Sequence, residues 1–579
     1  MNTMDRRTFL TGGALIASTA ALGALTGCAP KDNPESGALA NTSQSGDLPL
    51  SISQVDIDNS AVETETISEF ASEESYDIVV VGAGCAGVPA VLTALDEGAT
   101  VCCLQKESKA SANGAGASCV ALDYSDPGAI AQWTSLWAKE NNWRLNRTLF
   151  DYWASHSEET LSWLLQKGIA AGVEPVACIT AESVVFDNGG TVAVCKALQP
   201  SNQELMEALC AQAEKDGAVF HYSTPAVQLI QDDGAVTGVV GKNPDGSYIK
   251  VNANRGVILA TGDYMNNESL LARYNGDVVD WTPDLVNHTG DGHIMGTLAG
   301  GSIAPAPHPR QIHSLFSDNR IFLATPLVTL NPKGERFMDE ECVMTDWNTA
   351  MKYTYPEDME KIMYRFLDSA VAEKYPGVAT QEVVEGLVEG TIEGGGERGS
   401  GLGVGLATYK GDTLEELCYN MGIDDAAPFV AAIERYNELC AKGVDEDFGV
   451  DPQKMRPIDT PPYYGIINVP ATLSADNGGL LVDAHYQVVD ENGAPIPGLF
   501  AAGVVGGDIC GGVNWHMPAG SSNGHCFNAG RYTVIYALTG DLKPSHPASF
   551  KDVEALFADE DGKFMWDYPE IVSHDIPRW

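Results

Sequence analysis

The stretch VVVGAGCAGVPAVLTALDEGATVCCLQK, residues 79–106, decides the fold of this chain. The run YDIVVV, residues 76–81, is typical of a fully buried parallel strand. Gly82-x-Gly84-x-x-Gly87 follows at once and predicts a tight turn into a helix whose first amides hold a pyrophosphate. Because a strand precedes the glycines and a helix follows them, the motif strongly indicates dinucleotide binding.

The end of the second strand departs from the usual nucleotide-binding unit. Gln105 stands where an acidic residue normally accepts hydrogen bonds from the ribose hydroxyls. A glutamine amide oxygen can accept the same bonds without charge, so we expect nucleotide binding to survive there. The choice between NAD and FAD depends on the rest of the chain.

Segments far downstream complete the nucleotide fold. The pairs Asp233-Gly234 and Asp245-Gly246 predict hairpin turns, and GVILATGD, residues 256–263, predicts a second buried strand closed by glycine. IPGLFAAGVVGGD, residues 496–508, repeats that pattern, and GSSNGHCFNAGR, residues 520–531, begins a late helix. A nucleotide fold assembled from both ends of a chain, with an insertion between them, is how FAD rather than NAD is usually held.

Length and charge limit the function classes. At 579 residues the chain exceeds the usual single-core size, so we expect two or more domains. The formal net charge of -45 argues against nucleic acid or an anionic membrane surface as a partner, because both would repel the protein. No residue spacing indicates a metal site or a haem site, while an iron–sulfur cluster built from distant cysteines stays an open alternative.

The N-terminus, MNTMDRRTFLTGGALIASTAALGALTGCAP, predicts an export signal. Arg6-Arg7 and the apolar run to Gly27, which is shorter than the roughly 20 residues of a membrane span, are typical of the twin-arginine route. Cys28 in LTGC resembles a lipoprotein box, so we expect residues 1–28 to be a twin-arginine lipoprotein signal. A lipid on Cys28 would then anchor the protein to the extracytoplasmic face of the cell membrane. A plain secretory signal with an incidental cysteine is the alternative.

Residues 29–74 predict a disordered tether, because they are rich in Ser, Glu, Asp and Asn and carry one aromatic residue, Phe70. The 13 cysteines are scattered without a regular spacing. We interpret them mostly as small buried hydrophobic residues rather than as disulfide partners.

Together these motifs resemble the flavoprotein family of soluble fumarate reductases, urocanate reductases and 3-ketosteroid 1-dehydrogenases. The matching segments are VVVGAGCAG, SEETLSWLLQKGI, GVILATGD, HTGDGHIMGTLAGG, NPKGERFMDEE, TLEELCYNMGIDDAAPFVAAIERYNELCAKGVDEDFG and PIPGLFAAG. The resemblance implies an α/β fold with a Rossmann-like FAD-binding domain that is split in sequence, over 75–300 and 463–545. It also implies an inserted α+β capping domain over 301–462 and a C-terminal tail over 546–579.

The resemblance further implies a set of residues that contact FAD. They are Gly82, Gly84, Ala86, Gly87, Gln105, Lys106, Asn113, Gly114, Ala226, Val227, Ala260, Thr261, Gly262, Asp291, Gly503, Ser521 and Ser522.

The substrate side departs from the family pattern. In the family's fumarate chemistry a hydride passes from flavin N5 to an alkene carbon, an arginine gives the proton, and charged residues bind both carboxylates. Met344 stands at the expected position of the proton-donating arginine, Ala475 at that of a carboxylate-binding histidine, and Pro518 or Ala519 at that of a second arginine. Burying an unpaired dicarboxylate would cost several kcal/mol, so we do not expect fumarate as the substrate.

The remaining candidates suggest a wider and more neutral site for an aromatic or polycyclic enone or a similar unsaturated acid. Candidate catalytic residues are His313, His516 and Tyr463, and candidate substrate contacts are Met344, Asn514 and Trp515. Each has a structural alternative: His516 as a loop residue that binds the backbone, and Tyr463 with Tyr464 as an aromatic pair packed at a hinge. His308, between two prolines, is interpreted as part of a rigid turn.

Three functional hypotheses follow. The first is an exported FAD enzyme that reduces a carbon–carbon double bond of a small unsaturated acceptor. Because the chain carries no haem motif, its electrons would come from a separate membrane cytochrome or quinol-linked protein. The second is a ketosteroid-type dehydrogenase, which would need a tyrosine base near the flavin. The third is a flavin electron-transfer protein without a substrate site.

Overall fold

The computed structural model describes residues 48–558 and 562, except 115, 174–175, 179–183, 187, 199–200, 280, 284, 316–326, 342–343, 376–379, 391–407, 508 and 519. The predicted signal with Cys28 and residues 29–47 of the predicted tether therefore lie outside the described residues. Every helix within the described ranges is too short or too polar to span a bilayer.

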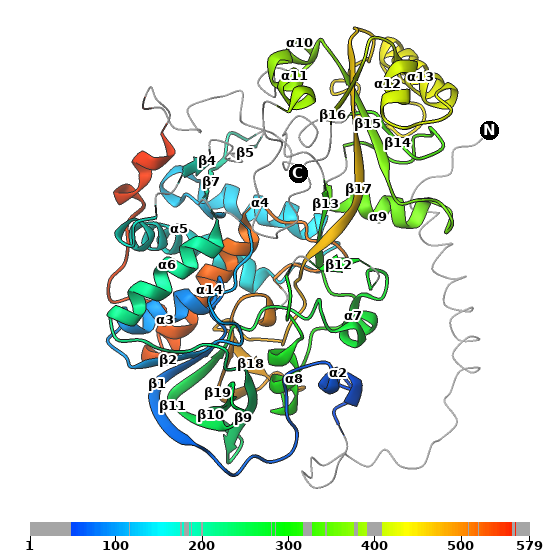
Figure 1. Cartoon of the computed structure of the whole chain (residues 1–579). Coiled ribbons are helices and arrows are strands. Elements are labelled where there is room, and N and C mark those ends of the chain that lie inside the picture. Colours follow the sequence, from blue (N-terminus) through cyan, green and yellow to red (C-terminus); the bar gives the residue numbers. More distant parts are fainter. Residues whose placement is uncertain are drawn as a thin grey trace, which may run out of the picture. The chain divides into compact units, whose positions relative to one another are not determined.

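Among the described residues, eight strands form the sheet on which the nucleotide fold is built (Figure 1). Its path runs β18-β19-β11-β1-β2-β8, with the hairpin β9-β10 paired to β11. The strands are β1 (Ser72–Val81), β2 (Val101–Leu104), β8 (Val219–His221), β9 (Ala226–Asp232), β10 (Ala235–Lys242), β11 (Tyr248–Leu259), β18 (Gln487–Val489) and β19 (Pro495–Ala501). β19 pairs in parallel with β11, so the predicted α/β fold assembled from both ends of the chain is confirmed.

Alternate residues of the central strands face two different cores, as the twofold period of a strand requires. Val80 and Cys103 pack under α3 (Gly87–Asp96), α5 (Arg147–Ala170), α6 (Asn202–Lys215) and α14 (Ser521–Thr539). Val79 and Cys102 pack instead against β9, β10 and β11. Helix α4 (Pro127–Glu140) and a small sheet of β3 (Gly116–Val120), β4 (Val176–Cys178) and β7 (Val194–Leu198) lie beside the helical layer, and β5 (Val184–Val185) pairs with β6 (Thr191–Val192).

A second sheet is organised around the long strand β17 (Tyr463–Asp476), which Figure 1 shows in orange. Its start pairs with β15 (Met363–Asp368) and β16 (Thr408–Gly411), and β14 (Thr329–Leu330) continues from β15. Its end pairs with β13 (Arg310–Leu315) and β12 (Thr282–Pro283). β17 begins directly after the predicted domain limit at residue 462 and pairs with strands that precede that limit, which stays a prediction.

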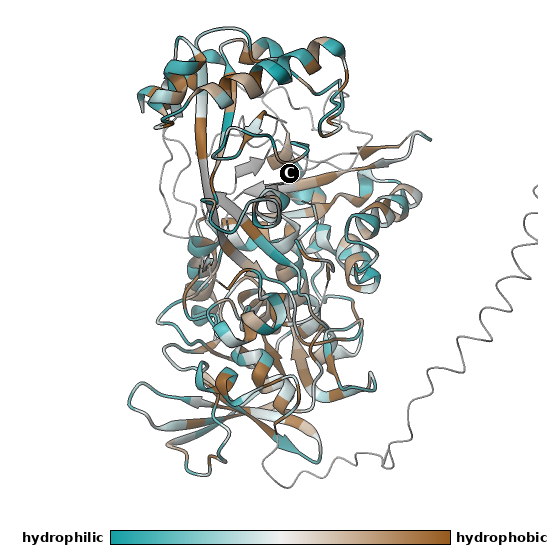
Figure 2. Ribbon diagram, turned by 90° about the vertical axis from the view of Figure 1, so that its right-hand side faces the viewer, coloured by the Kyte–Doolittle hydropathy of each residue, from teal (hydrophilic) through white to brown (hydrophobic). Residues whose placement is uncertain are grey.

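Helices cover this second sheet at its β15 and β16 end. They are α10 (Val371–Lys374), α11 (Gln381–Glu389), α12 (Leu414–Asn420) and α13 (Ala427–Lys442), while α9 (Met344–Thr354) packs beside β13. In α13 the buried residues Phe429, Ile433, Tyr436 and Leu439 recur every three or four positions, and Figure 2 shows the helices of this region alternating between hydrophobic and hydrophilic residues. Short helices α7 (Glu268–Asn275) and α8 (Asp291–Leu298) lie in the segment before β13.

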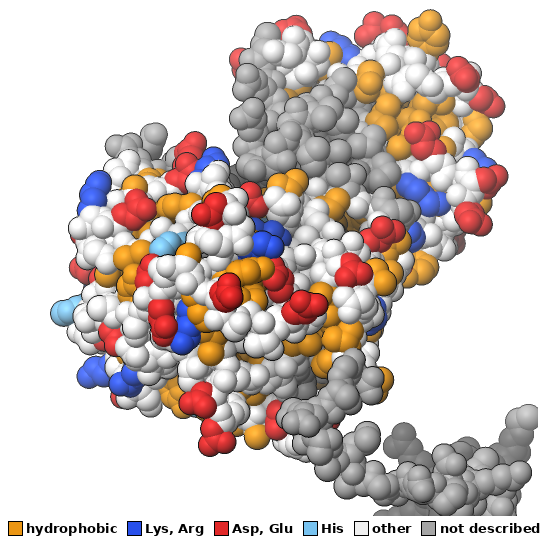
Figure 3. All heavy atoms as spheres, turned by 60° about the horizontal axis from the view of Figure 1, so that its bottom comes forward, with side chains coloured by type: hydrophobic (Ala, Val, Ile, Leu, Met, Phe, Trp, Pro, Cys, Tyr) orange, Lys and Arg blue, Asp and Glu red, His pale blue; other side chains and the backbone are white. Residues whose placement is uncertain are grey.

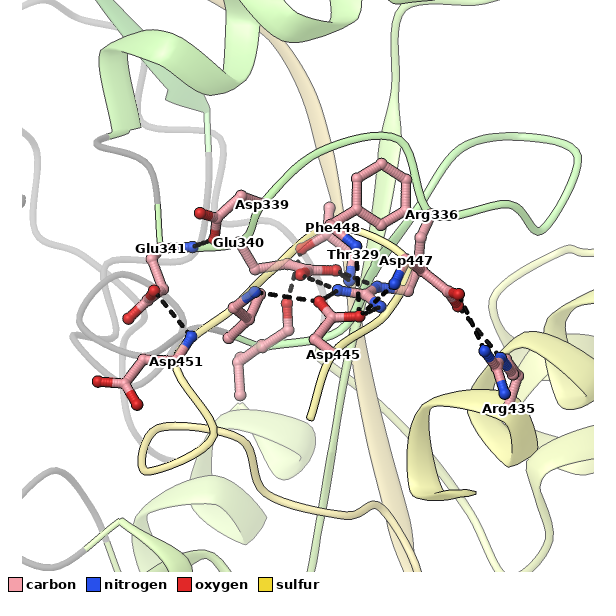
Figure 4. A network of polar contacts seen from close by, with 12 residues as sticks. Thr329, Arg336, Asp339, Glu340, Glu341, Arg435, Asp445, Asp447, Phe448 and Asp451 are labelled. Carbon is pink, nitrogen blue, oxygen red and sulfur yellow. Dashed lines mark hydrogen bonds and ion pairs between the residues drawn. The ribbon is translucent and has the colours of Figure 1, made fainter. Parts of the chain in front are cut away.

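A buried ionic network fastens the segment after β14 to the segment after α13 (Figure 4). Arg336 donates to Glu340 over 2.8 and 2.6 Å and to Asp445 over 3.1 and 2.9 Å. Its guanidinium also lies 5.1 Å from the ring of Tyr436 and 4.9 Å from that of Phe448. The arginine of the GERF motif thus has a structural function here.

The prediction of a disordered tether is wrong over residues 48–74. Ser53 forms a capping box at the start of α2 (Gln54–Asp58), and Ile52, Ile57 and Val62 are buried in the core below the sheet. Asp56 is fully buried and forms an ion pair with Arg273. The few apolar residues of this polar segment are spaced so that all three reach a core formed by the rest of the chain.

Other local expectations are confirmed. Asp233 and Gly234 both have positive φ in the turn between β9 and β10, as a tight hairpin requires. Of the ten cysteines whose side chains the structure describes, eight are buried, as expected of small hydrophobic residues. Figure 3 shows acidic side chains spread over the face it presents rather than gathered in one patch.

Candidate active site

The carboxyl ends of the parallel strands meet at one edge of the sheet, where the predicted cofactor residues lie. Gly82 follows β1 and donates to the carbonyl of Leu104 over 2.8 Å, and Ala260 follows β11 and donates to Val81 over 2.8 Å. Gly503 begins a short helix directly after β19. Turns from three strands, distant in sequence, are therefore brought together.

This edge has the features that FAD requires. No side chain caps the first turns of α3 and α14, the helix ends at which backbone N–H groups bind phosphate oxygens. A Cβ on Gly84 would lie 2.8 Å from a backbone carbonyl, so the chain approaches closely here and a side chain is excluded. The buried hydroxyls of Thr261 and Ser521 have no hydrogen-bond partner among the described residues.

Gln105 stabilises the glycine turn, a function that the sequence did not predict. Its side-chain oxygen accepts from Ala83 N over 3.2 Å, and its amide donates to the carbonyl of Lys109 over 2.8 Å. The second lone pair of the same oxygen stays available for a ribose hydroxyl. The predicted ribose contact is compatible with this geometry and stays a prediction.

Lys106 and Asp291 form a second polar contact at this edge. Lys106 Nζ donates to Asp291 Oδ2 over 3.0 Å and to Thr289 Oγ1 over 2.7 Å. Asp291 also accepts from the backbone of Ala61 over 3.1 Å. The folded segment before β1 thus reaches the predicted cofactor site, and Asp291 already has protein partners.

The other predicted cofactor residues lie at the starts or ends of elements, and their contact with FAD stays a prediction. Ala86 and Gly87 begin α3, Asn113 and Gly114 precede β3, Ala226 and Val227 begin β9, Gly262 follows β11, and Ser522 lies in the first turn of α14.

On the substrate side, the loop before α14 meets the first turn of α9. His516 Nε2 lies 3.0 Å from Asp346 Oδ1, and Asn514 donates to the same oxygen over 2.6 Å. Thr349 completes the group at 2.9 Å from the Asn514 amide. Burial disfavours the charged form of His516, but the hydrogen bond and charge of Asp346 outweigh it and raise the pKa of His516.

Apolar side chains adjoin this polar group. Trp515 and Met517 are 6% and 8% exposed. The backbone of Trp515 donates to the carbonyl of Arg310 over 2.8 Å, so the loop pairs with β13. The guanidinium of Arg310 is bonded to Asp277 and lies 3.5 Å from Asn275 Oδ1, while its Nε is buried without a partner among the described residues.

A buried polar network lies against the ADNGG segment, and sequence reasoning missed it. Asp476 accepts from Asn275, Tyr264 Oη lies 2.6 Å from His308 Nδ1, and His308 Nδ1 lies 3.7 Å from Asp476. Burial raises the pKa of Asp476 to about 7, and burial lowers the pKa of His308 to about 4. His308 is therefore a fully buried member of this network as well as a turn residue.

Asn477, the next residue, is 2% exposed, and neither polar atom of its amide has a partner among the described residues. Leaving a buried amide unpaired is costly, so a ligand is expected to meet it. In the sequence, Asn477 could have been found because it lies two residues after Ala475, the position compared with the family's carboxylate-binding histidine.

For three of the predicted site residues, the described part of the structure shows no contact with the group of Asp346, Asn514 and His516. His313 lies in β13 and Met344 begins α9, while their side chains fall outside the described part. Tyr463 is the first residue of β17 and packs in the core formed with α12 and α13. It is separated from Asp476 by the whole strand, roughly 40 Å at about 3.3 Å per residue, and its predicted catalytic function stays a prediction.

Comparisons with known proteins agree with this geometry. The model of the FAD binding domain family matches residues 77–523. The vinyl phenol reductase of Lactiplantibacillus plantarum is 28% identical over 81% of this chain and 97% of its own length. The urocanate reductase of Eggerthella lenta is 27% identical over 74% of this chain and 69% of its own length.

Solved structures share the fold. A flavocytochrome c3 fumarate reductase in its open conformation superimposes with a TM-score of 0.58 at 23% identity, covering 80% of this chain and 79% of the other. A 3-ketosteroid-Δ4-(5α)-dehydrogenase from Rhodococcus jostii gives 0.56 at 22% identity, covering 82% and 98%. The chain therefore belongs to the FAD binding domain family, and it is an FAD-dependent oxidoreductase of the fumarate reductase-like group, whose members act on carbon–carbon double bonds or the corresponding single bonds.

Proposed function

We propose that this protein reduces the double bond of a small unsaturated acceptor that lacks a second carboxylate, and that vinyl phenols and related aromatic alkenes are the best candidates. The observation that carries the proposal is the loop before α14, where Asn514, Trp515 and His516 meet Asp346. Fumarate would need cationic partners for two carboxylates. Arg310, whose backbone pairs with this loop, is already bonded to Asp277.

The chemistry of the loop suits an aromatic acceptor. FAD, when bound, supplies the hydride. Trp515 offers a flat apolar surface for a ring. Asn514 offers its side-chain oxygen to a phenol hydroxyl, because both of its N–H groups already donate to Asp346 and Thr349. His516 keeps its proton to higher pH because of Asp346, so it is our candidate for the residue that gives a proton to the substrate.

Export and anchoring belong to the same proposal. The paired Arg6 and Arg7 and the LTGC sequence at Cys28 support a twin-arginine lipoprotein that acts on the extracytoplasmic face of the membrane. A separate membrane cytochrome or quinol-linked protein would then supply electrons. Mass spectrometry of the N-terminus tests this part of the proposal. A lipid-modified Cys28 at the N-terminus would support it, and retention of residues 1–27 would contradict it.

The test is anaerobic turnover with reduced viologen as donor and 4-vinylphenol, a hydroxycinnamic acid and fumarate as acceptors. We expect products that are two hydrogens heavier from the first two, little from fumarate, and no activity with NADH as donor. Equal turnover of fumarate would contradict the proposal. The dehydrogenase alternative needs a tyrosine base, and Tyr463 and Tyr464 both pack in cores on the far part of β17.

A further inference from the structure

Three side chains of metal-binding type lie on the sheet face that β9, β10 and β11 cover. Glu74 of β1, Cys102 of β2 and His221 of β8 bring one ligand atom each to within 4.8 Å of one another. Glu74 Oε2 and His221 Nε2 lie 3.0 Å apart. None of the three belongs to the predicted cofactor or substrate residues.

The pairing of the strands explains why Cys102 and His221 share a face. Cys102 stands opposite Val219 in the parallel pair β2-β8. His221 is two residues beyond Val219, and side chains two residues apart on a strand point to the same side. Cys103, one residue further along β2, faces the helical layer instead.

A bulge brings Glu74 to the other two. The register of β1 against β11 shifts between Tyr76 and Ile78, where β11 carries one extra residue. Such a bulge bends the strand, and β1 pairs with β2 only from Ile78 onward. The first residues of β1 therefore bend away from β2 together with β11. Glu74 then lies close to Cys102 and His221.

Thiolate, imidazole and carboxylate are the ligands that Zn²⁺ takes in proteins. Zinc–ligand distances of about 2.0–2.3 Å put tetrahedral ligands roughly 3.3–3.8 Å apart, so small side-chain rotations close the site. The side chains of Glu74 and His221 are 27% and 24% exposed, which leaves a route for the ion and room for a water as fourth ligand. Tyr76 donates to Glu74 over 3.0 Å and can orient its carboxylate.

Zinc takes cysteine as the thiolate, so binding at Cys102 releases a proton. The net charge of -45 also favours cations over the whole molecule.

We propose that Glu74, Cys102 and His221 form a zinc site that cross-links β1, β2 and β8. The site is independent of the proposed reaction. It adjoins the nucleotide edge of the sheet, because the carbonyl of His221 accepts from Gln105 N over 2.9 Å. Zinc should therefore stabilise the strand ends that carry the cofactor turn.

The test uses the purified FAD-loaded protein, treated with chelator and titrated with zinc chloride in a calorimeter, with metal content measured by mass spectrometry. We expect about one zinc per chain and release of a proton. Cys102→Ala and His221→Gln should each weaken binding by at least about 100-fold, since even outer-shell changes cost 10–100-fold.

Cys103→Ala is the matched control, because it removes the neighbouring thiol from the opposite face and should leave zinc affinity unchanged. His221→Gln alters a partly exposed side chain, so it serves as the second variant if Cys102→Ala fails to fold. The proposal is overturned if the wild-type protein binds no zinc in stoichiometric amount, or if Cys103→Ala weakens binding as much as Cys102→Ala.

Discussion

Replacing Arg336 by methionine should greatly destabilise the region around β14 and α13. The change removes four N–H···O contacts and leaves the carboxylates of Glu340 and Asp445, 1% and 0% exposed, without their cation. Breaking a buried ion pair from one side costs about 3–5 kcal/mol. With a urea m-value of about 1–3 kcal/mol/M, the unfolding midpoint should fall by about 1 M or more.

Arg435→Met is the matched control for this prediction, since Figure 4 shows Arg435 paired with Asp447 at the edge of the same network. Both of those side chains are partly exposed to solvent, so the midpoint should move much less. Urea unfolding followed by tryptophan fluorescence measures both variants. Equal midpoints for the two variants would refute the reasoning.

The same network predicts an acid dependence. Burial would raise the pKa of Asp445, but Arg336 outweighs it and lowers the value from 3.8 to about 2. A lowered folded pKa adds stability above the unfolded pKa, and that stability is lost as the pH falls from 3.8 toward about 2. Arg336→Met should therefore show less loss of stability over that interval than the wild type.

Asp346→Asn should shift the alkaline limb of the pH profile of kcat/KM to lower pH, because it removes the charge that raises the pKa of His516. An unmoved limb would show that His516 does not set it. Asp476→Asn should flatten the pH dependence of the free energy of unfolding. The neutral acid stabilises the folded state fully at low pH, and this contribution is lost as the pH rises through about 7. Urea titrations at several pH values measure the slope, and a slope equal to that of the wild type would contradict the prediction. Gly84→Val should lower the ratio of flavin to protein absorbance, because its Cβ would lie 2.8 Å from a carbonyl, whereas Gly128→Val, with no atom within 4 Å, should retain FAD. Equal flavin content in these two variants would contradict the assigned turn.

The sequence predicted the nucleotide fold well, because its signals are local. Gly82, Gly84 and Gly87 follow a buried strand, and the runs at 256–263 and 496–508 repeat the same pattern of strand and glycine turn. Parallel strands that are buried on both faces are continuous apolar runs, so these runs identify the central strands of the sheet directly.

Features that the sequence did not predict depend on contacts between segments that are distant in sequence. Residues 48–74 are polar on average, and only the core below the sheet gives Ile52, Ile57 and Val62 a place to pack. Tyr463 is the first residue of the predicted second FAD-binding segment, but a 14-residue strand separates it from Asp476. His308 lay between two prolines, and its network with Tyr264 could not be read from spacing.

The central claim is that the reduced flavin of this enzyme passes its hydride to a neutral aromatic alkene and not to fumarate. Single-turnover stopped-flow spectroscopy of the anaerobically reduced protein tests it, with 4-vinylphenol or fumarate as the oxidant and flavin absorbance as the signal. Two missing charge-assisted contacts of about 1.5–3 kcal/mol each predict reoxidation at least about 100-fold faster with 4-vinylphenol. Reoxidation by fumarate at an equal or greater rate would contradict the account.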